Sequence, residues 1–264
     1  MLLTIDAGNT RTKWAIFDCN GEITQHGACV NDQISVMDLS PKSLGYERVI
    51  ISNVAGKTHA SRLESLLASH HLPITWVSAS LEACQVRNGY MKAETLGADR
   101  WAALIAAWHI QQAPCIVVNA GTAVTIDALS PSTNNQQGEF LGGMILPGVK
   151  LMLTSLGQNT AQLPKPDAAH ELDANIYLDI FSKSTTHAIN AGVLNAITGA
   201  ITQMSKALAT KCGQIPYIIL SGGDAPVIQS YLINTVKKPS IIIDHLVLKG
   251  LCLIDRFNNK TIIK

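Results

Sequence analysis

The chain begins with short hydrophobic runs separated by turns that are rich in Gly, Asn and Asp. Met1–Ile5 is mostly apolar, polar residues follow, and Trp14–Phe17 is apolar again. Asp18-Cys19-Asn20-Gly21 supplies a second turn. This pattern predicts a meander of three strands at residues 1–6, 12–18 and 22–30.

Strands and helices alternate along the rest of the chain. Leu63, Leu66 and Leu67 fall on one face of a predicted helix, and Pro147 suits the first turn of another. The remaining predicted strands are 49–52, 74–77, several from 115 to about 145, 216–221 and 240–244; the predicted helices are 58–71, 97–109, 147–156, 184–210, 224–235 and 246–257. A strand meander followed by helices occurs twice. The sequence therefore predicts an α/β fold of two similar subdomains, 1–114 and 115–264, each a mixed sheet plus helices, with a central cleft.

The first predicted turn contains the side chains needed to bind a nucleotide triphosphate. Gly8 lets backbone N–H groups approach a ligand closely, and Asn9 and Thr10 can donate hydrogen bonds to phosphate oxygens. Lys13 adds a positive charge, and Asp6 can hold Mg²⁺ directly or through water. An ordinary hairpin turn would also be rich in these residues.

Two later loops repeat this chemistry. Asn119-Ala120-Gly121-Thr122-Ala123 follows an apolar run and lies 113 residues after Asp6-Ala7-Gly8-Asn9-Thr10. Ser221-Gly222-Gly223-Asp224 follows a further apolar run, and its glycines leave room for a nucleotide against the backbone. Two facing glycine turns, one from each half, can clamp a phosphate chain from both sides.

A fourth segment, Gly97-Ala98-Asp99-Arg100, stands at the start of a predicted helix. The helix dipole favours an ionised carboxylate in the first turn, so Asp99 is expected to stay ionised and to accept a proton from a substrate hydroxyl. Arg100 offers a fork of donors suited to a substrate carboxylate. The alternative is that Asp99 only stabilises the helix and that Arg100 is a surface residue.

Composition limits the classes of function. The chain has 264 residues, a net charge of +1 and 47% hydrophobic residues. The sequence shows no basic face, which argues against nucleic-acid binding, and no apolar run of membrane-spanning length. Six cysteines without a CxxC pair are typical of reduced thiols, and together with the absence of a signal-peptide pattern they predict a cytoplasmic protein.

In order along the chain, Asp-Ala-Gly-Asn-Thr, Gly-Ala-Asp-Arg, Ala-Gly-Thr-Ala and Gly-Gly-Asp-Ala resemble type III pantothenate kinase. That family, which includes proteins labelled Bvg accessory factor, belongs to the superfamily of acetate and sugar kinases, Hsp70 and actin. The resemblance runs from Met1 to about Gly250. It implies a duplicated actin-like, ribonuclease H-like fold. It also implies ATP-dependent phosphorylation of pantothenate to 4′-phosphopantothenate, the first step of coenzyme A biosynthesis.

The resemblance also assigns roles to residues. It implies that Asp99 is the catalytic proton acceptor and that Mg²⁺ accompanies ATP at Asp6, through water. The implied ATP and phosphate-binding residues are Asp6, Ala7, Gly8, Asn9, Thr10, Arg11, Thr12, Lys13 and Thr122. The implied pantothenate-binding residues are Tyr90, Gly97, Ala98, Asp99, Arg100 and Thr185. Tyr90 as an aromatic packing residue and Thr185 as a simple helix cap are the alternatives.

A homodimer is implied as well, with the apolar helices 97–112 and 184–210 as candidate contact surfaces. The alternative for these helices is that they belong to the internal core. A dimer of this kind would bind pantothenate near the subunit interface.

Asn119 departs from the family pattern. The family usually has an aspartate there, which binds a monovalent cation, K⁺ or NH₄⁺. Asparagine keeps an oxygen ligand but loses the charge, so we expect potassium dependence to be weak or absent. The same change keeps open a non-catalytic regulatory or accessory relative. A kinase of the same superfamily acting on another small hydroxy or carboxylic acid is a further alternative, against which Tyr90 and the Gly-x-Asp-Arg segment argue.

Overall fold

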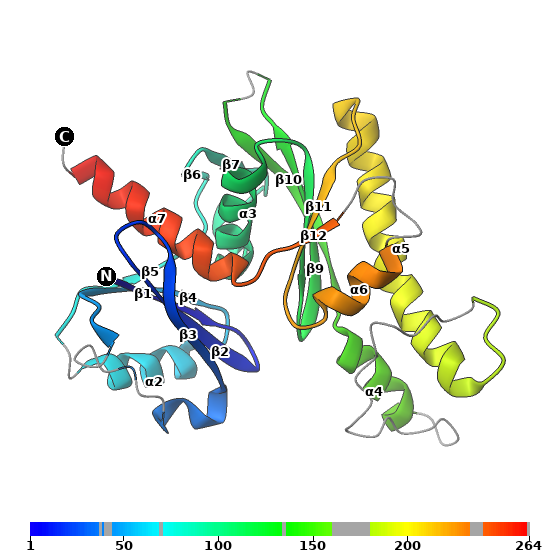
Figure 1. Ribbon diagram of the computed structural model, residues 1–264, viewed down its shortest axis with the longest axis horizontal. Coiled ribbons are helices and arrows are strands. Elements are labelled where there is room, and N and C mark those ends of the chain that lie inside the picture. The colour runs from blue at the N-terminus through cyan, green and yellow to red at the C-terminus, as the bar shows by residue number, and fades with distance from the viewer. Residues whose placement is uncertain are drawn as a thin grey trace. The chain divides into compact units, whose positions relative to one another are not determined.

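The N-terminal strand β1 (Leu2–Ala7) is the central strand of a five-stranded sheet (Figure 1). It pairs antiparallel with β2 (Arg11–Phe17) and parallel with β4 (Arg48–Asn53). β3 (Ile23–Val30) and β5 (Ile74–Trp76) complete the order β3-β2-β1-β4-β5. The computed structural model describes residues 1–36, 39, 44–68, 71–133, 136–159, 180–232 and 240–262.

Side-chain alternation along β1 separates the face that packs against α2 from the face that carries Asp6. Leu3 and Ile5 belong to a cluster with Leu63 and Leu67 of helix α2 (Lys57–Ala68). Asp6 lies between Ile5 and Ala7, so its side chain points to the opposite face. Helices α2 and α7 (Leu246–Ile262) lie on opposite sides of this sheet (Figure 1).

The C-terminal helix α7 is held to this sheet by an ion pair. Arg48 Nε lies 3.1 and 3.0 Å from the two carboxylate oxygens of Asp255, and Arg48 Nη2 lies 2.8 Å from Asp255 Oδ2. Asp255 is 8% exposed, so the bidentate contact also satisfies a buried charge. Gly250 lets α7 approach helix α3 (Ala98–Gln111), because a Cβ there would lie 1.9 Å from the carbonyl oxygen of Ala102.

These contacts change the predicted division of the chain. Residues Met1–Ile110 and His245–Lys264 form one compact unit, and Gln111–Asp244 form the other. The expected boundary at 114/115 assigned the last helix to the second subdomain, whereas the structure places α7 in unit 1. The reason is the long-range contact between Arg48 and Asp255, which local sequence patterns do not reveal.

Unit 2 repeats the strand order of unit 1. Its sheet contains β8 (Cys115–Ala120), β9 (Ala123–Pro131), β10 (Gly138–Pro147), β11 (Tyr217–Ser221) and β12 (Ser240–Ile242), in the order β12-β11-β8-β9-β10. β8 pairs antiparallel with β9 and parallel with β11, as β1 does with β2 and β4. The prediction of two similar α/β subdomains is therefore confirmed.

One face of this second sheet packs against helices. Ile116 and Val118 of β8 share a core with residues of α4 (Val149–Asn159), α5 (Thr185–Cys212) and α6 (Ala225–Leu232). Asn119 alternates with these residues and therefore points to the other face of the β8 strand. Asn119 and Asp6 thus hold equivalent places in the two sheets.

Several short elements were not predicted from the sequence. They are the 3₁₀ helices η1 (Asn31–Val36) and η2 (Ala93–Thr95) and the hairpin of β6 (Glu82–Ala83) and β7 (Val86–Asn88). The hairpin turn places Cys84 and Gln85 at φ values of 48° and 61°. Positive φ normally favours Gly or Asn, so the usual turn signal is missing here.

Most predicted elements differ from the observed ones only at their ends. Helix α7 continues beyond 257 to Ile262, and the several strands predicted from 115 to about 145 are the three strands β8, β9 and β10. The predicted ends of helices 58–71 and 224–235 lie partly outside the described residues. No helix in the described ranges is long and apolar enough to cross a membrane. None of the six cysteines, all of which lie in the described ranges, forms a disulfide.

Helix α3 belongs to the core. Ten of its 14 residues are buried, including Trp101 and Trp108. Of the two helices considered as dimer contacts, this one therefore follows the alternative of an internal core helix. The burial of α3 matters for the site, because Asp99 and Arg100 lie in its first turn and packing fixes the position of the helix.

Candidate active site

Three polar side chains form a row across the centre of the unit 1 sheet. Asp6 is the register partner of Lys13 on β2 and of Ser52 on β4. Register partners on neighbouring strands point to the same face, so the three side chains share the face opposite α2. Because β1 and β4 are parallel, Asp6 and Ser52 also lie together at the carboxyl ends of their strands, where α/β sheets bind ligands.

Two oxygens of this row lack a protein partner. Asp6 Oδ1 and Ser52 Oγ are both buried and make no hydrogen bond. A buried polar atom without a partner costs about 1–3 kcal/mol, and such atoms in folded proteins usually meet a ligand, an ion or water. A carboxylate beside a hydroxyl suits a hydrated Mg²⁺ ion, which prefers oxygen ligands and retains water. The residues present therefore fit a magnesium site in which Asp6 takes part.

Burial makes Asp6 unusually basic. The pKa of its carboxyl rises from 3.8 to about 7, mainly because the carboxylate is removed from water and also because Asp99 carries a like charge nearby; Lys13 opposes the rise. Because Asp99 is close enough to Asp6 to raise its pKa, the start of helix α3 lies near the polar row. Neighbouring carboxyl groups whose pKa values are perturbed are typical of functional sites.

The environment of Asp99 corrects one expectation. Burial raises the pKa of Asp99, although the backbone N–H of Arg100 and the Arg100 charge both lower it. The position at a helix start therefore does not by itself keep this carboxyl strongly acidic. Desolvation has the larger effect on the pKa of Asp99. The position of Asp99 at a helix start did not predict this effect.

Gly97 makes room for the Asp99 carboxylate. A Cβ at Gly97 would lie 2.6 Å from Asp99 Oδ1. The same oxygen accepts a hydrogen bond of 2.8 Å from the backbone N–H of Arg100. The carboxylate therefore folds back over the glycine in a fixed direction, and Ala98 beside it is buried.

Arg100 and Tyr90 are brought together. Arg100 Nη1 donates a hydrogen bond of 2.8 Å to Tyr90 Oη, and Arg100 Cζ lies 5.5 Å from the centre of the tyrosine ring. Arg100 is 6% exposed, so the alternative of a surface residue is wrong. Asn88 orders the turn before them, because its Oδ1 accepts from the Tyr90 N–H at 3.0 Å and its Nδ2 donates to the Ala93 carbonyl at 3.2 Å.

The predicted phosphate loop is a short exposed tip between buried strand ends. Asn9, Thr10 and Arg11 are exposed, whereas Ala7 and Thr12 are fully buried. The Gly8 N–H donates to the Arg11 carbonyl at 3.2 Å and closes the tip. Ala7 and Thr12 thus belong to the strands that support the loop.

The glycine loops of unit 2 pack tightly on one another. Gly148 donates its N–H to the Thr122 carbonyl at 2.9 Å, and a Cβ at Gly148 would lie 2.0 Å from the Gly121 carbonyl oxygen. Gly222 has a φ of 100°, and a Cβ there would lie 2.1 Å from the Ala120 carbonyl oxygen. Larger residues are excluded at both positions, so these loops present backbone close to any ligand.

The row of unit 2 that corresponds to Lys13, Asp6 and Ser52 carries no charged side chain. Asn119 pairs in register with Thr125 and Ser221, at the places that Lys13 and Ser52 occupy beside Asp6. The two rows differ by Asp to Asn and by Lys to Thr. Unit 2 therefore offers neutral oxygens where unit 1 offers a charged pair.

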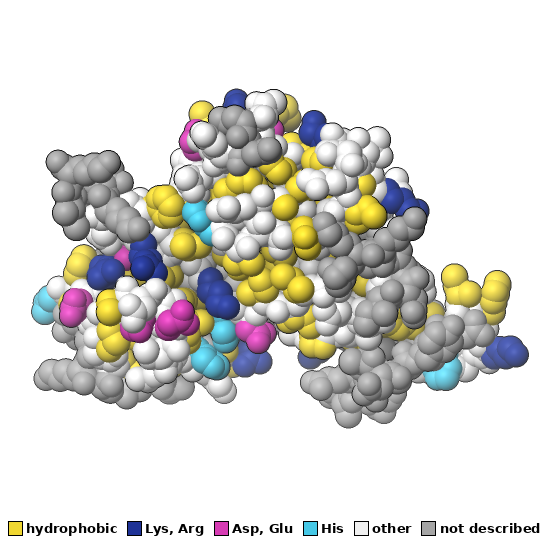
Figure 2. Space-filling model, turned by 45° about the horizontal axis from the view of Figure 1, so that its top comes forward, with side chains coloured by type: hydrophobic (Ala, Val, Ile, Leu, Met, Phe, Trp, Pro, Cys, Tyr) yellow, Lys and Arg dark blue, Asp and Glu magenta, His cyan; other side chains and the backbone are white. Residues whose placement is uncertain are grey.

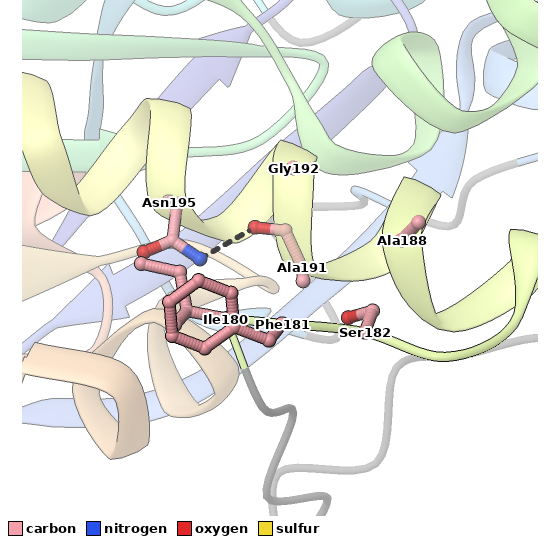
Figure 3. A pocket seen from close by; sticks show the side chains of 7 residues that line it. All are labelled: Ile180, Phe181, Ser182, Ala188, Ala191, Gly192 and Asn195. Atoms are coloured by element: carbon pink, nitrogen blue, oxygen red, sulfur yellow. Dashed lines mark hydrogen bonds between the residues drawn. The ribbon is translucent and has the colours of Figure 1, made fainter.

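Thr185 begins helix α5 but does not cap it. Ser184 is the N-cap, and its Oγ accepts a hydrogen bond of 3.3 Å from the His187 N–H. The alternative that Thr185 is the helix cap is therefore wrong. A cavity of about 350 Å³ lies along the next turns of α5, between segment 180–182 and the helix (Figure 3). Its lining contains none of the predicted site residues.

Ser52 was not predicted from the sequence. It follows the apolar run Val49–Ile51 without any motif around it. The signal that could have found it is the duplication, since Ser52 and Ser221 stand beside the two equivalent residues Asp6 and Asn119.

We predict that replacing Asp6 removes a pH dependence of stability. Because folding raises the pKa of Asp6 from 3.8 to about 7, the folded state binds a proton that the unfolded chain lacks. The stability that this group contributes is thus full below about pH 4 and is lost as the pH rises towards 7, at about 1.4 kcal/mol per pKa unit before solvent screening. Asp6→Asn should lose less stability than the parent between pH 5 and pH 8, and should be more stable than the parent at pH 8.

The matched control is Asp18→Asn. Asp18 is a carboxylate of unit 1 whose pKa is lowered by turn hydrogen bonds, first of all from the Glu22 N–H. This variant should keep the parent's slope between pH 5 and 8. Equal slopes for the parent and Asp6→Asn would show that Asp6 does not titrate as described.

The fold resembles those of solved proteins with little sequence similarity. A Campylobacter jejuni protein of the Baf family superimposes with a TM-score of 0.62 at 21% identity, covering 98% of this chain and 99% of that one. A Sinorhizobium meliloti protein described as a 2-dehydro-3-deoxygalactonokinase superimposes with a TM-score of 0.60 at 13% identity, covering 97% and 96%. These likenesses concern the fold alone.

The sequence is much more similar to members of one family than to these solved proteins. A protein from Methylobacillus flagellatus named type III pantothenate kinase is 42% identical over 260 residues, covering 97% of this chain and 98% of its own length. One of the same name from Nitrosospira multiformis is 39% identical over 265 residues, covering 99% and 93%. The family model for type III pantothenate kinase matches residues 2–207. The chain that carries Asp6 and Asp99 therefore belongs to the type III pantothenate kinase family.

Proposed function

We propose that this protein transfers the γ-phosphoryl group of ATP to pantothenate, giving ADP and 4′-phosphopantothenate, the first step of coenzyme A biosynthesis. The observation that carries the proposal is the row of Lys13, Asp6 and Ser52 beside Asp99. In this arrangement, the row would bind phosphate and the start of α3 would bind the substrate. The two are joined by the interacting carboxyl groups of Asp6 and Asp99. Membership of the family supports the same reaction.

The phosphate loop would position ATP. Gly8, Asn9 and Thr10 offer backbone and side-chain donors, and Lys13 offers positive charge, to the phosphate oxygens. Thr122 and the glycine loops of unit 2 would supply further contacts to ATP. Bound Mg²⁺ would neutralise phosphate charge, with Asp6 and Ser52 holding it through water. Asp6 must be ionised for that task, which ties nucleotide binding to proton release.

Asp99 would act on the substrate hydroxyl. As the primary hydroxyl of pantothenate forms its bond to the γ-phosphorus, the bond to the ADP oxygen breaks, and the hydroxyl proton moves to the Asp99 carboxylate. A base with a raised pKa accepts this proton more readily than an ordinary carboxylate would. Positioning and charge neutralisation supply most of the remaining acceleration.

Arg100 and Tyr90 would recognise the acid substrate. Pantothenate carries a carboxylate, which a guanidinium can bind through two hydrogen bonds. The Tyr90 contact holds the Arg100 side chain in place. Gly97 and Ala98 would leave space for the substrate beside Asp99, and Thr185 would contact it from α5.

The partners proposed are ATP, pantothenate and a second copy of the chain, in the cytoplasm. On the face shown in Figure 2, Lys and Arg side chains stand in small separate groups with Asp and Glu near several of them. The net charge of +1 agrees with that distribution. Both favour a small-molecule substrate over nucleic acid.

We predict that Asp99→Asn lowers pantothenate-dependent ADP release by at least about a hundredfold, because it removes the proton acceptor. The measurement is a coupled ADP-release assay with ATP, Mg²⁺ and pantothenate. Binding of ATP should be retained, since Asp99 is assigned to the acceptor. Glu64→Gln, an exposed carboxylate on α2, is the control and should match the parent.

Other outcomes of this assay separate the alternatives. Full activity of Asp99→Asn would contradict the assigned role of Asp99. A folded parent that binds ATP but turns over neither pantothenate nor any of a panel of sugars and hydroxy acids would favour a non-catalytic regulatory relative. Turnover of another acid from that panel, without pantothenate turnover, would indicate a kinase of the same superfamily with a different substrate.

We predict weak or absent potassium dependence, because Asn119 and its register partners Thr125 and Ser221 carry no charge. The ADP-release rate should change less than about twofold when K⁺ or NH₄⁺ replaces a bulky cation at constant ionic strength. Asn119→Asp restores the charge and should gain a potassium requirement. A steep rise of the parent's rate with K⁺ would contradict this prediction.

We predict a homodimer in solution. Ile180 and Phe181 are 71% and 80% exposed, and they border the cavity on α5 shown in Figure 3. Large exposed apolar groups beside a cavity are typical of protein interfaces. Light scattering should give twice the mass of the 28.3 kDa chain. A monomer mass at micromolar concentration would contradict this prediction.

A further inference from the structure

Asn31, just beyond β3, makes three hydrogen bonds to the phosphate loop. Its Nδ2 donates to the carbonyl oxygens of Gly8 at 2.8 Å and Asn9 at 3.0 Å. Its backbone N–H donates to the Thr10 carbonyl at 3.2 Å. Three consecutive loop carbonyls are therefore directed at one residue that lies 21 positions further along the chain than Thr10.

These bonds also set the direction of the loop N–H groups. The structure contains no cis peptide bond among the described residues. In a trans peptide the carbonyl and the following N–H point in opposite directions. Since the Gly8 and Asn9 carbonyls face Asn31, the N–H groups of Asn9 and Thr10 point away from it. Two successive N–H groups turned outwards are a typical anion-binding arrangement.

The orientation of the Asn31 amide can be deduced from its partners. Only the NH₂ end can donate to two carbonyls, so the Oδ1 end must be the acceptor that lies 2.9 Å from Thr12 Oγ1. Thr12 has one hydroxyl proton, and this contact uses it. The ring nitrogen Nε2 of His59, 2.8 Å from the same Oγ1, must therefore carry a proton and donate it.

A directional chain of hydrogen bonds follows. It runs from His59 on α2 to Thr12 on β2, from Thr12 to Asn31, and from Asn31 to the loop carbonyls. Thr12 is fully buried and His59 is 5% exposed, so water competes little for these groups. Burial lowers the pKa of His59, and the charge of Arg62 lowers it further, which agrees with a neutral ring.

We propose that Asn31, Thr12 and His59 are positioning residues that hold the phosphate loop in its ATP-binding conformation. The inference rests on the proposed function, because it assigns the loop to ATP. None of the three needs to touch the nucleotide through its side chain. Asn31 fixes the direction of the peptide groups, Thr12 fixes the amide of Asn31, and His59 fixes the hydroxyl of Thr12.

The test uses the whole chain and measures affinity for Mg–ATP by calorimetry, independently of turnover. Asn31→Asp keeps the shape but loses both Nδ2 donors, and should bind Mg–ATP at least about tenfold more weakly. Thr12→Val loses the hydroxyl and should bind about fivefold more weakly. Thr12→Ser keeps the hydroxyl and should recover most of the parent's affinity.

Thr4→Val is the matched control. Thr4 is also fully buried in the same sheet, and its hydroxyl donates to the Ala15 carbonyl at 3.2 Å without contacting the loop. This variant should lose stability, as Thr12→Val does, while keeping the parent's affinity. Equal loss of affinity in Thr4→Val and Thr12→Val would show a general structural effect and overturn the proposal.

The His59 contribution has its own readout. The ¹⁵N spectrum of the imidazole should show a proton on Nε2 and none on Nδ1 at pH 8, and a proton on Nδ1 alone would overturn the chain as drawn. Unchanged affinity in Asn31→Asp would also overturn the proposal. A parent that binds no Mg–ATP would instead count against the proposed function, and the positioning role would fall with it.

Discussion

Strand β1 imposes the constraint on which the rest of unit 1 depends. It is paired on both sides, antiparallel to β2 and parallel to β4, so its register fixes which residues share a face. Leu3 and Ile5 must meet α2, and Asp6 must then face the other way. A shift by one residue would turn the carboxylate towards α2 and turn Leu3 and Ile5 away from it. The site is thus positioned by the same packing that forms the core.

The two units show how one framework can acquire different chemistry. Their strand orders agree, and their central strands are 113 residues apart. The turn after β8 is one residue shorter than the turn after β1, since Val124 pairs with Ala120 where Thr12 pairs with Ala7. Charge is kept in the first row and lost in the second. The central row therefore carries a charged pair in unit 1 and only neutral polar groups in unit 2.

Local features were predictable from the sequence, and long-range ones were not. Alternation and glycine turns predicted the strands around Asp6 and the helix that begins near Asp99. They did not predict that α7 packs in unit 1, that Arg100 is buried, or that burial raises the pKa of Asp99. Ser52, Asn31 and His59 were missed for a common reason. Each acts on a residue at least 19 positions away in the chain, and none stands in a motif.

The ion pair between Arg48 and Asp255 joins residues separated by 207 positions. The helix that covers one face of the unit 1 sheet is consequently missing until α7 has been synthesised. On the ribosome, unit 2 emerges complete before unit 1 can be closed. The phosphate loop and Asp99 are translated early, yet the fold that supports them is finished last. Assembly of unit 1 is thereby coupled to the synthesis of helix α7, which follows all of unit 2 in the chain.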